Sequence, residues 1–231
     1  MKSFKVRVVI VALLLFLMYL PLGAQGFDYQ MIVSNSINWS KIDWRYKIDY
    51  QLRLKDNVRS LDRHLLEFVG TYMPSRSWEL VPDFRISITP DIIEYRPGFG
   101  VIYKITWGKK IFFRQLVNQV KYQADIEESG RVKHGFRHVL FYNHLITKEL
   151  LFSSGSALFF RWQDNFTGFQ FYRAVVGLIY IFDSTHSLGI SPYFGIEDPL
   201  GAISFTGGVM IGYSIRLRDS FKYLPARYIN F

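Results

Sequence analysis

The segment from Glu94 to Asp125 alternates between two kinds of side chain, and this alternation limits the folds open to the chain. Large apolar groups recur at every second position except Pro97: Tyr95, Phe99, Val101 and Tyr103. The positions between them hold charge or glycine: Glu94, Arg96, Gly98, Gly100 and Lys104. A period of two is the period of a β-strand. After a short Trp-Gly-Lys-Lys turn a second run returns to Asp125, so a hairpin with one apolar and one polar face is predicted.

The segment Trp44–Leu54 shows the same division most clearly. Aromatic and aliphatic residues occupy its even positions, and Arg, Lys, Asp and Gln occupy the odd ones. A helix would scatter both classes around its axis. At about 3.3 Å per residue, a strand of this length can cross a tilted barrel wall.

The alternation continues to Leu217, interrupted by polar turns. Pro82 and Pro97 fall inside strands, where we expect bulges or bends. The pattern predicts an all-β fold, an antiparallel up-and-down transmembrane β-barrel of about ten strands. Twelve strands are the alternative, if Phe221–Phe231 pairs with Phe27–Trp39.

The first residues predict the compartment. A basic start is followed by the apolar run Val8–Leu22 and by small residues up to Ala24, which is typical of a secretory signal peptide. We therefore expect a signal peptide over residues 1–24, a periplasmic lead-in or weak first strand over 25–43, the outer-membrane barrel over 44–217, and a C-terminal tail or final strand over 218–231. An even strand count would place both termini in the periplasm of a Gram-negative bacterium.

Composition agrees with a membrane barrel. Aromatic residues make up 18% of the chain, and strands and membrane-interface girdles both favour them. An aromatic-rich soluble β-sandwich is the alternative. The formal charge of +9 falls to +6 without the signal peptide, which contains three cations and no acids. The cations are scattered along strands, so no nucleic-acid partner is expected. With no Cys, the chain has no disulfides or thiolate metal sites.

The polar face contains the candidate functional residues. We expect a ladder of charged side chains in the lumen: Arg45, Lys47, Asp49, Arg53, Glu79, Asp83, Arg85, Glu94, Arg96, Lys104, Lys121, Arg137, Glu149, Arg161 and Arg216. Buried charges must be paired, so the first interpretation is a set of ion pairs that holds the barrel closed. The alternative is a narrow pore or ligand cavity with a basic lining that selects anions, for which several glycines would leave room.

No catalytic, metal-binding or cofactor-binding residues are predicted. His134 and His138 would share a strand face about 13 Å apart, too far to hold one ion. Candidate Ser/His neighbours such as His186 and Ser187 do not share a face.

A family resemblance supports the barrel. The segments Trp78–Arg85, Glu94–Gly98 and Arg114–Tyr122, with Gly135–His138 and Phe171–Arg173, resemble the small outer-membrane barrels of Bacteroidota catalogued as a domain of unknown function. The resemblance covers about residues 40–217 and implies an outer-membrane barrel without an established activity.

The functional expectation is a non-enzymatic outer-membrane barrel with a structural, binding or small-solute transport role. The alternative is a lipid-modifying barrel enzyme, an acyl hydrolase or transferase. The expected partners are outer-membrane lipid and, during biogenesis, the barrel assembly machinery, which reads a terminal aromatic such as Phe231.

Overall fold

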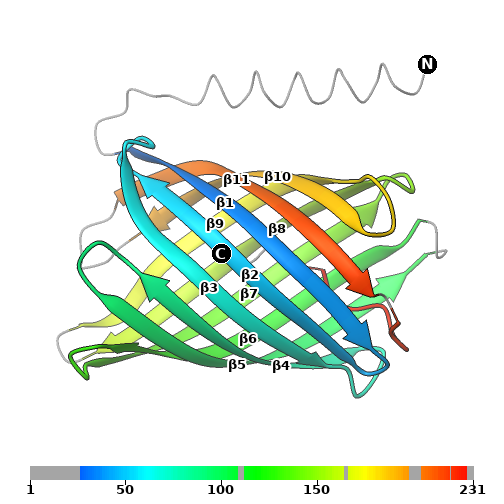
Figure 1. The fold of residues 1–231 in the computed structure, drawn as a ribbon, viewed down its shortest axis with the longest axis horizontal. Helices are drawn as coiled ribbons and strands as arrows, with labels where there is room; N and C mark the ends of the chain where they lie inside the picture. Colours follow the sequence, from blue (N-terminus) through cyan, green and yellow to red (C-terminus); the bar gives the residue numbers. More distant parts are fainter. Residues whose placement is uncertain (1–26, 109–111, 164–165, 198–203, 219, 228–231) are drawn as a thin grey trace.

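The computed structural model describes residues 27–108, 112–163, 166–197, 204–218 and 220–227, and the predicted signal peptide lies outside these ranges. The described residues form eleven strands in one closed barrel (Figure 1). The strands are β1 (Phe27–Lys41), β2 (Trp44–Lys55), β3 (Ser60–Tyr72), β4 (Trp78–Ile88), β5 (Ile93–Trp107), β6 (Arg114–Glu127), β7 (Val132–Leu145), β8 (Leu150–Gln163), β9 (Phe166–Ile181), β10 (His186–Glu197) and β11 (Ser204–Arg218). The predicted all-β barrel is confirmed. Among the described residues, no helix is long and apolar enough to cross a membrane.

The barrel closes through one parallel pair. Every strand is antiparallel to its neighbours in sequence, but β1 lies parallel to β11, from Phe27 opposite Phe205 to Trp39 opposite Arg218. Residues 27–41 are therefore a full strand. The twelve-strand alternative is wrong for the described residues, because β11 occupies the edge of β1 that a final strand would have needed.

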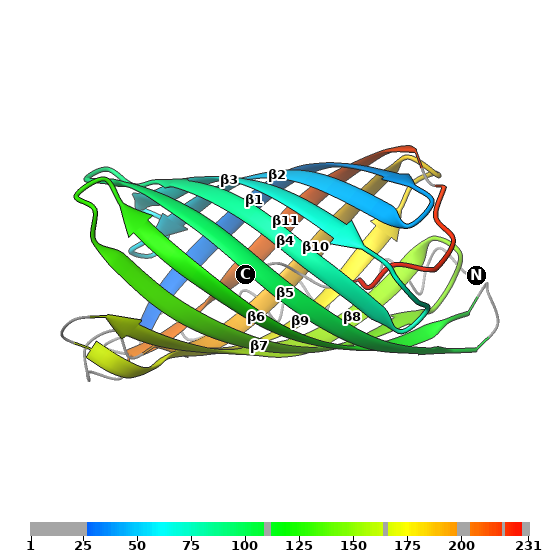
Figure 2. The same ribbon diagram turned by 90° about the horizontal axis from the view of Figure 1, so that it is seen from below.

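Because β1 and β11 run parallel, the first and last strands of the barrel begin and end at opposite rims. We call the rim where β1 begins the N-rim and the rim where β11 ends the C-rim. Phe27 lies at the N-rim and Arg218 at the C-rim, so an argument from an even strand count does not apply to this barrel. Both rims carry short connections, and the C-terminal segment lies at the C-rim (Figure 2).

The two faces of the barrel are inverted relative to a water-soluble protein. Along β4, the buried inward positions include Glu79, Asp83 and Arg85, whereas the outward Trp78 and Phe84 are exposed. In water this arrangement would expose hydrocarbon and bury charge at high cost. A hydrocarbon surround removes the cost of the apolar outer face, and the closed sheet pairs the strand backbones with one another. The fold is that of a transmembrane barrel.

Tryptophan gathers on the outer face near the C-rim. Trp44 stacks on Tyr46, Trp78 packs on Tyr103, and Trp107 packs on Tyr142. The aromatic pair that includes Trp162 lies nearer the N-rim. Aromatic rings on the outer face near the two ends of the strands are typical of the interface girdles of membrane barrels.

No bulge occurs at either proline. Pro82 lies opposite Phe99 and Pro97 opposite Phe84 in a register that runs unbroken from Trp78 to Ile88. On their other edges the register also continues without a shift, but the described pairing passes over both prolines. The described irregularities occur elsewhere, for example between Arg53 and Leu54.

Candidate functional site in the barrel lumen

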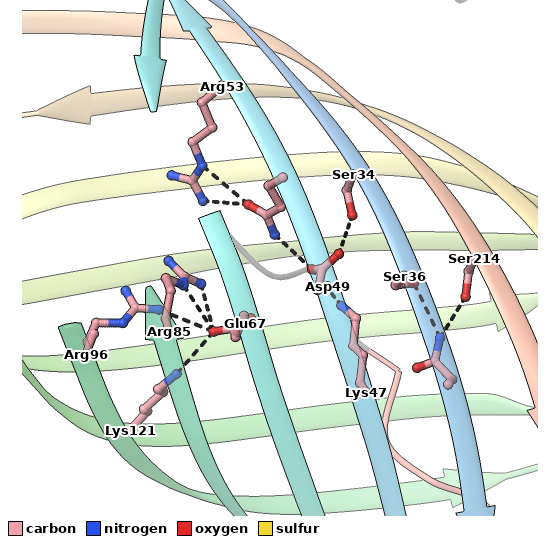
Figure 3. A network of polar contacts seen from close by, with 12 residues as sticks. Ser34, Ser36, Lys47, Asp49, Arg53, Glu67, Arg85, Arg96, Lys121 and Ser214 are labelled. Atoms are coloured by element: carbon pink, nitrogen blue, oxygen red, sulfur yellow. Dashed lines mark hydrogen bonds and ion pairs between the residues drawn. The ribbon is translucent and has the colours of Figure 1, made fainter. Parts of the chain in front are cut away.

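Glu67 on β3 is the acidic centre of the lumen. Its Oε1 accepts hydrogen bonds from Nε and Nη2 of Arg85 at 3.2 and 2.9 Å, and from Nη2 of Arg96 at 3.3 Å. The ammonium of Lys121 lies 3.9 Å from the same oxygen (Figure 3). It also lies 2.6 Å from Oδ2 of Asp83. The three cationic partners of Glu67 come from β4, β5 and β6, so together with β3 this cluster ties four adjacent strands together.

Further ion pairs follow the same wall toward both rims. Toward the C-rim, Glu79 pairs with Lys104, and both side chains are almost fully buried. Toward the N-rim, Asp125 pairs with Arg161 at 2.9 Å. Other pairs near the N-rim include Arg63 with Glu94 at 3.7 Å and Lys133 with Glu94 at 3.2 Å. Paired charge thus fills much of this side of the lumen. On the far wall, Arg173 of β9 pairs with Glu197 of β10.

A second polar chain runs along β2. Asp49 accepts hydrogen bonds from Ser34 at 2.6 Å, from Lys47 at 2.9 Å and from the amide of Gln51 at 2.9 Å. The oxygen of that amide accepts from Arg53 at 3.0 and 3.3 Å (Figure 3). The four residues of β2 in this chain alternate along the strand, and therefore share its inward face.

Two cavities flank this chain. The N-rim cavity has a volume of about 600 Å³, and the C-rim cavity about 220 Å³. The C-rim cavity has serines from β1, β8, β10 and β11 in its lining. Arg53 lines the N-rim cavity and Gln51, two residues before it, lines the C-rim cavity, so this hydrogen-bonded pair lies between the two cavities.

The predicted ladder residues divide between these regions. Four of them line the C-rim cavity: Arg45, Lys47, Asp49 and Arg216. Six line the N-rim cavity: Arg53, Arg85, Glu94, Arg96, Arg137 and Arg161. Four more are buried in ion pairs: Glu79, Asp83, Lys104 and Lys121.

Glu149 is the exception, and its assignment to the lumen is wrong. It lies in the exposed turn between β7 and β8 at the C-rim, one residue before β8 begins at Leu150. Its carbonyl accepts a hydrogen bond from the backbone N–H of Ile181 at 2.7 Å.

Several lumen residues were missing from the predicted ladder. Glu67, Asp125, Arg173 and Glu197 all form ion pairs there. Each one sits at the inward parity of its strand, which strict counting along the strand would have indicated. The ion-pair partners of these residues could not be predicted from parity, because they depend on the register between strands.

The C-terminal segment Phe221–Arg227, which we call the tail segment, folds back against the lumen at the C-rim (Figure 1). The backbone N–H of Arg227 donates to Oε1 of Gln115 at 2.9 Å. The amide of Asn143 donates to the carbonyl of Arg227 at 2.7 Å. The tail segment is therefore bound by inward side chains of β6 and β7.

Two further contacts seat the tail segment. The N–H of Ala226 donates to Glu79 at 2.7 Å, and Arg45 donates to the Ala226 carbonyl at 3.1 Å. Ala226 is fully buried, and Leu224 packs on a cluster that contains Leu151. The tail segment occupies space that would otherwise belong to the lumen.

The glycines expected to widen the lumen differ in what surrounds them. A Cβ on Gly98 would lie 2.8 Å from both Asp83 and Lys121, so its missing side chain admits that ion pair. A Cβ on Gly155 would meet the ring of Phe141 at 2.5 Å. Of these three glycines, only Gly212 leaves room for a side chain, because a Cβ there would lie 4.0 Å from Ser34.

The histidines form separate contacts. His134 bonds to Tyr122 at 2.6 Å and His138 to Asn118 at 3.0 Å. His186 bonds through Nδ1 to Asp183 at 3.0 Å, in the turn between β9 and β10, and this bond lowers the pKa of the Asp183 carboxyl. In the part of the chain that is described, no group of His, Asp and Glu is arranged to hold a metal ion.

Comparisons with known proteins bear on the fold alone. No protein-family model matches the chain, and no curated protein matches its sequence. A solved structure of the NanC porin, in a rhombohedral crystal form, is similar to this chain with a TM-score of 0.51 and 12% sequence identity. The match covers 82% of this chain and 99% of the porin chain. The chain therefore shares a porin-like barrel architecture with that protein.

Proposed function

We propose that this chain is a non-enzymatic outer-membrane protein that passes small polar solutes through its lumen. The main support is the pair of lumen cavities, lined by charged side chains at the N-rim and by several serines at the C-rim, inside a barrel whose outer face is apolar. The porin-like architecture agrees with this role. The basic and apolar start of the sequence supplies the secretory route that such a protein needs.

The passage we propose is narrow. The charged cluster around Glu67 fills the side of the lumen formed by β3 to β6, and the tail segment narrows the C-rim. The wall of β1, β10 and β11 presents smaller groups to the C-rim cavity, among them Ser34, Ser191 and Gly212. Solutes would follow this small-residue wall.

Histidine placement supports a non-enzymatic role. His186 is held by Asp183 and stacks on Tyr213, whereas Ser187 lines the C-rim cavity. A hydrolytic triad requires the base to reach the nucleophile, and adjacent residues of a strand point to opposite faces.

Conductance in planar bilayers tests the proposal. We expect small, steady current steps from protein that is shown to be folded by faster gel migration before boiling. Vesicles that contain the protein should also swell in an isosmotic solution of a small sugar. Folded protein that gives neither current nor swelling would contradict the channel and leave a structural or binding role.

The secretory route has its own test. Protein isolated from an outer-membrane fraction should begin at Gln25 on N-terminal sequencing. A chain that begins at Met1 and fractionates elsewhere would contradict both the signal peptide and the location.

A further inference from the structure

Like charges lie directly opposite one another on adjacent strands in the lumen. Arg85 pairs in register with Arg96, and Lys121 with Arg137. Side chains at such positions start about 5 Å apart, and like charges there are destabilising. Negative charge close to each pair offsets this repulsion.

The acidic residues of the protein supply part of this compensation. Glu67 serves Arg85, Arg96 and Lys121 together, and Asp125 serves both Arg96 and Arg161. Asp83 pairs with Lys121, and Glu197 pairs with Arg173. These four carboxylates face seven cations, since Arg53 and Arg137 also line the N-rim cavity. The protein's own acids leave a net positive charge at this level of the lumen.

Arg53 on β2 adds to the excess. Both of its described hydrogen bonds go to the neutral amide of Gln51. Arg85 and Arg173 each lie close enough to Arg53 to repel its charge, and Asp62 offsets part of that repulsion. Only β3 separates β2 from β4, whereas β9 lies across the lumen from both.

These groups line the N-rim cavity. The charged side chains around it are nine Lys and Arg against five Asp and Glu. Its volume of about 600 Å³ is typical of sites for small ligands. The buried Nε donors of Arg96 and Arg173 have no hydrogen-bond partner among the described residues, so the donor capacity of the cluster is not saturated.

We propose that the N-rim cavity binds a small organic or inorganic anion through carboxylate or phosphate oxygens. Arg53, Arg85 and Arg173 are the residues that would hold it. Guanidinium groups present a planar fork of donors that matches these oxyanions, and charge-assisted hydrogen bonds are the strong ones. The proposal gives the solute class for the proposed channel, but binding at this site does not require conduction.

Titration calorimetry of the folded protein in a zwitterionic detergent tests the site. Citrate serves as the carboxylate probe, inorganic phosphate as the phosphate probe and glucose as the neutral control. We expect saturable binding of at least one anion, weakened by added chloride, and no binding of glucose. Citrate alone, phosphate alone or both would identify the oxyanion chemistry.

A matched pair of variants locates the binding. Arg53→Gln should weaken anion binding about tenfold, because a charge-assisted bond to the ligand is lost. Arg59→Gln removes the same charge from the exposed turn between β2 and β3 at the N-rim, outside the lining of the cavity, and should weaken binding less than about threefold, the effect of diffuse charge alone. Equal losses in the two variants, or no saturable binding of either anion, would overturn the site.

Failure of the site and failure of the channel are distinguishable. Saturable binding by a protein that is silent in bilayers would retain the anion site and reject conduction. Current steps from a protein that binds neither anion would do the reverse.

Discussion

At the residue scale, Glu67 illustrates how one carboxylate can hold several strands. It lies on β3 and contacts Arg85 and Lys121 on β4 and β6. An unpaired charge is costly in such a buried position, so removal of the Glu67 carboxylate would leave its cationic partners uncompensated. The contribution of Glu67 to stability therefore comes from its partners as much as from itself.

Glu67→Gln should lower the free energy of unfolding by about 3 kcal/mol, because Arg85, Arg96 and Lys121 lose the carboxylate that they share. Urea titration in detergent micelles measures the change. Glu149→Gln is the control, and since Glu149 is exposed at the C-rim its effect should stay within about 0.5 kcal/mol. Similar effects for the two variants would contradict the central role of Glu67.

Gly208→Ala tests the closing seam. A Cβ at Gly208 would lie 1.9 Å from the carbonyl oxygen of Gln30 on β1, so the backbone must move to admit it. We expect a loss of about 1–3 kcal/mol in the free energy of unfolding. Gly212→Ala lies on the same face of β11, where a Cβ would contact only Ser34 at 4.0 Å, and should be close to neutral. A neutral Gly208→Ala would show that β1 does not pack on β11 in this register.

At the element scale, the tail segment behaves as part of the lumen rather than as a twelfth strand. Its hydrogen bonds go to inward side chains of β2, β4, β6 and β7. Its one described bridge to a neighbouring backbone joins Phe221 to Ile42. It therefore narrows the C-rim without extending the sheet.

Releasing the tail segment should widen the channel. The double substitution Gln115→Ala and Asn143→Ala removes two side chains that hold Arg227, and single-channel conductance should rise about twofold or more as the C-rim opens. The pair Gln119→Ala and Gln123→Ala removes comparable volume from the inward face of β6 without touching the tail segment. If this control pair raises conductance as much, the tail segment does not limit the current.

At the scale of the whole molecule, the parallel closure places the start of β1 and the end of β11 at opposite rims of the barrel. The turn at Ser129 lies at the N-rim and the turn at Lys148 at the C-rim. A barrel that spans the membrane exposes these turns on opposite sides.

Because the chain has no cysteine, single substitutions can report on each side. We expect a membrane-impermeant maleimide to label only one of Ser129→Cys and Lys148→Cys in intact cells, and both after lysis. Labelling of both variants in intact cells would contradict a spanning barrel with these ends.

The sequence alone determined the two-faced strands, and with them the barrel. A period of two puts every second residue on the same face in any register, so β2 could be predicted nearly to the residue as Trp44–Leu54, and most of the lumen charges from the same parity. β1 was the weakest prediction, because the polar run Ser34–Ser36 obscures its alternation.

Only the tertiary structure decided which charges meet and how the barrel closes. Parity assigns a face but not a partner, so it could not show that Glu67 collects Arg85, Arg96 and Lys121 from three other strands. The parallel pairing of β1 with β11 joins segments some 180 residues apart and leaves no local signal. The fold of the tail segment into the lumen depends on the same long-range contacts. Local periodicity determines what a strand shows to each side, whereas register and closure depend on packing across the whole barrel.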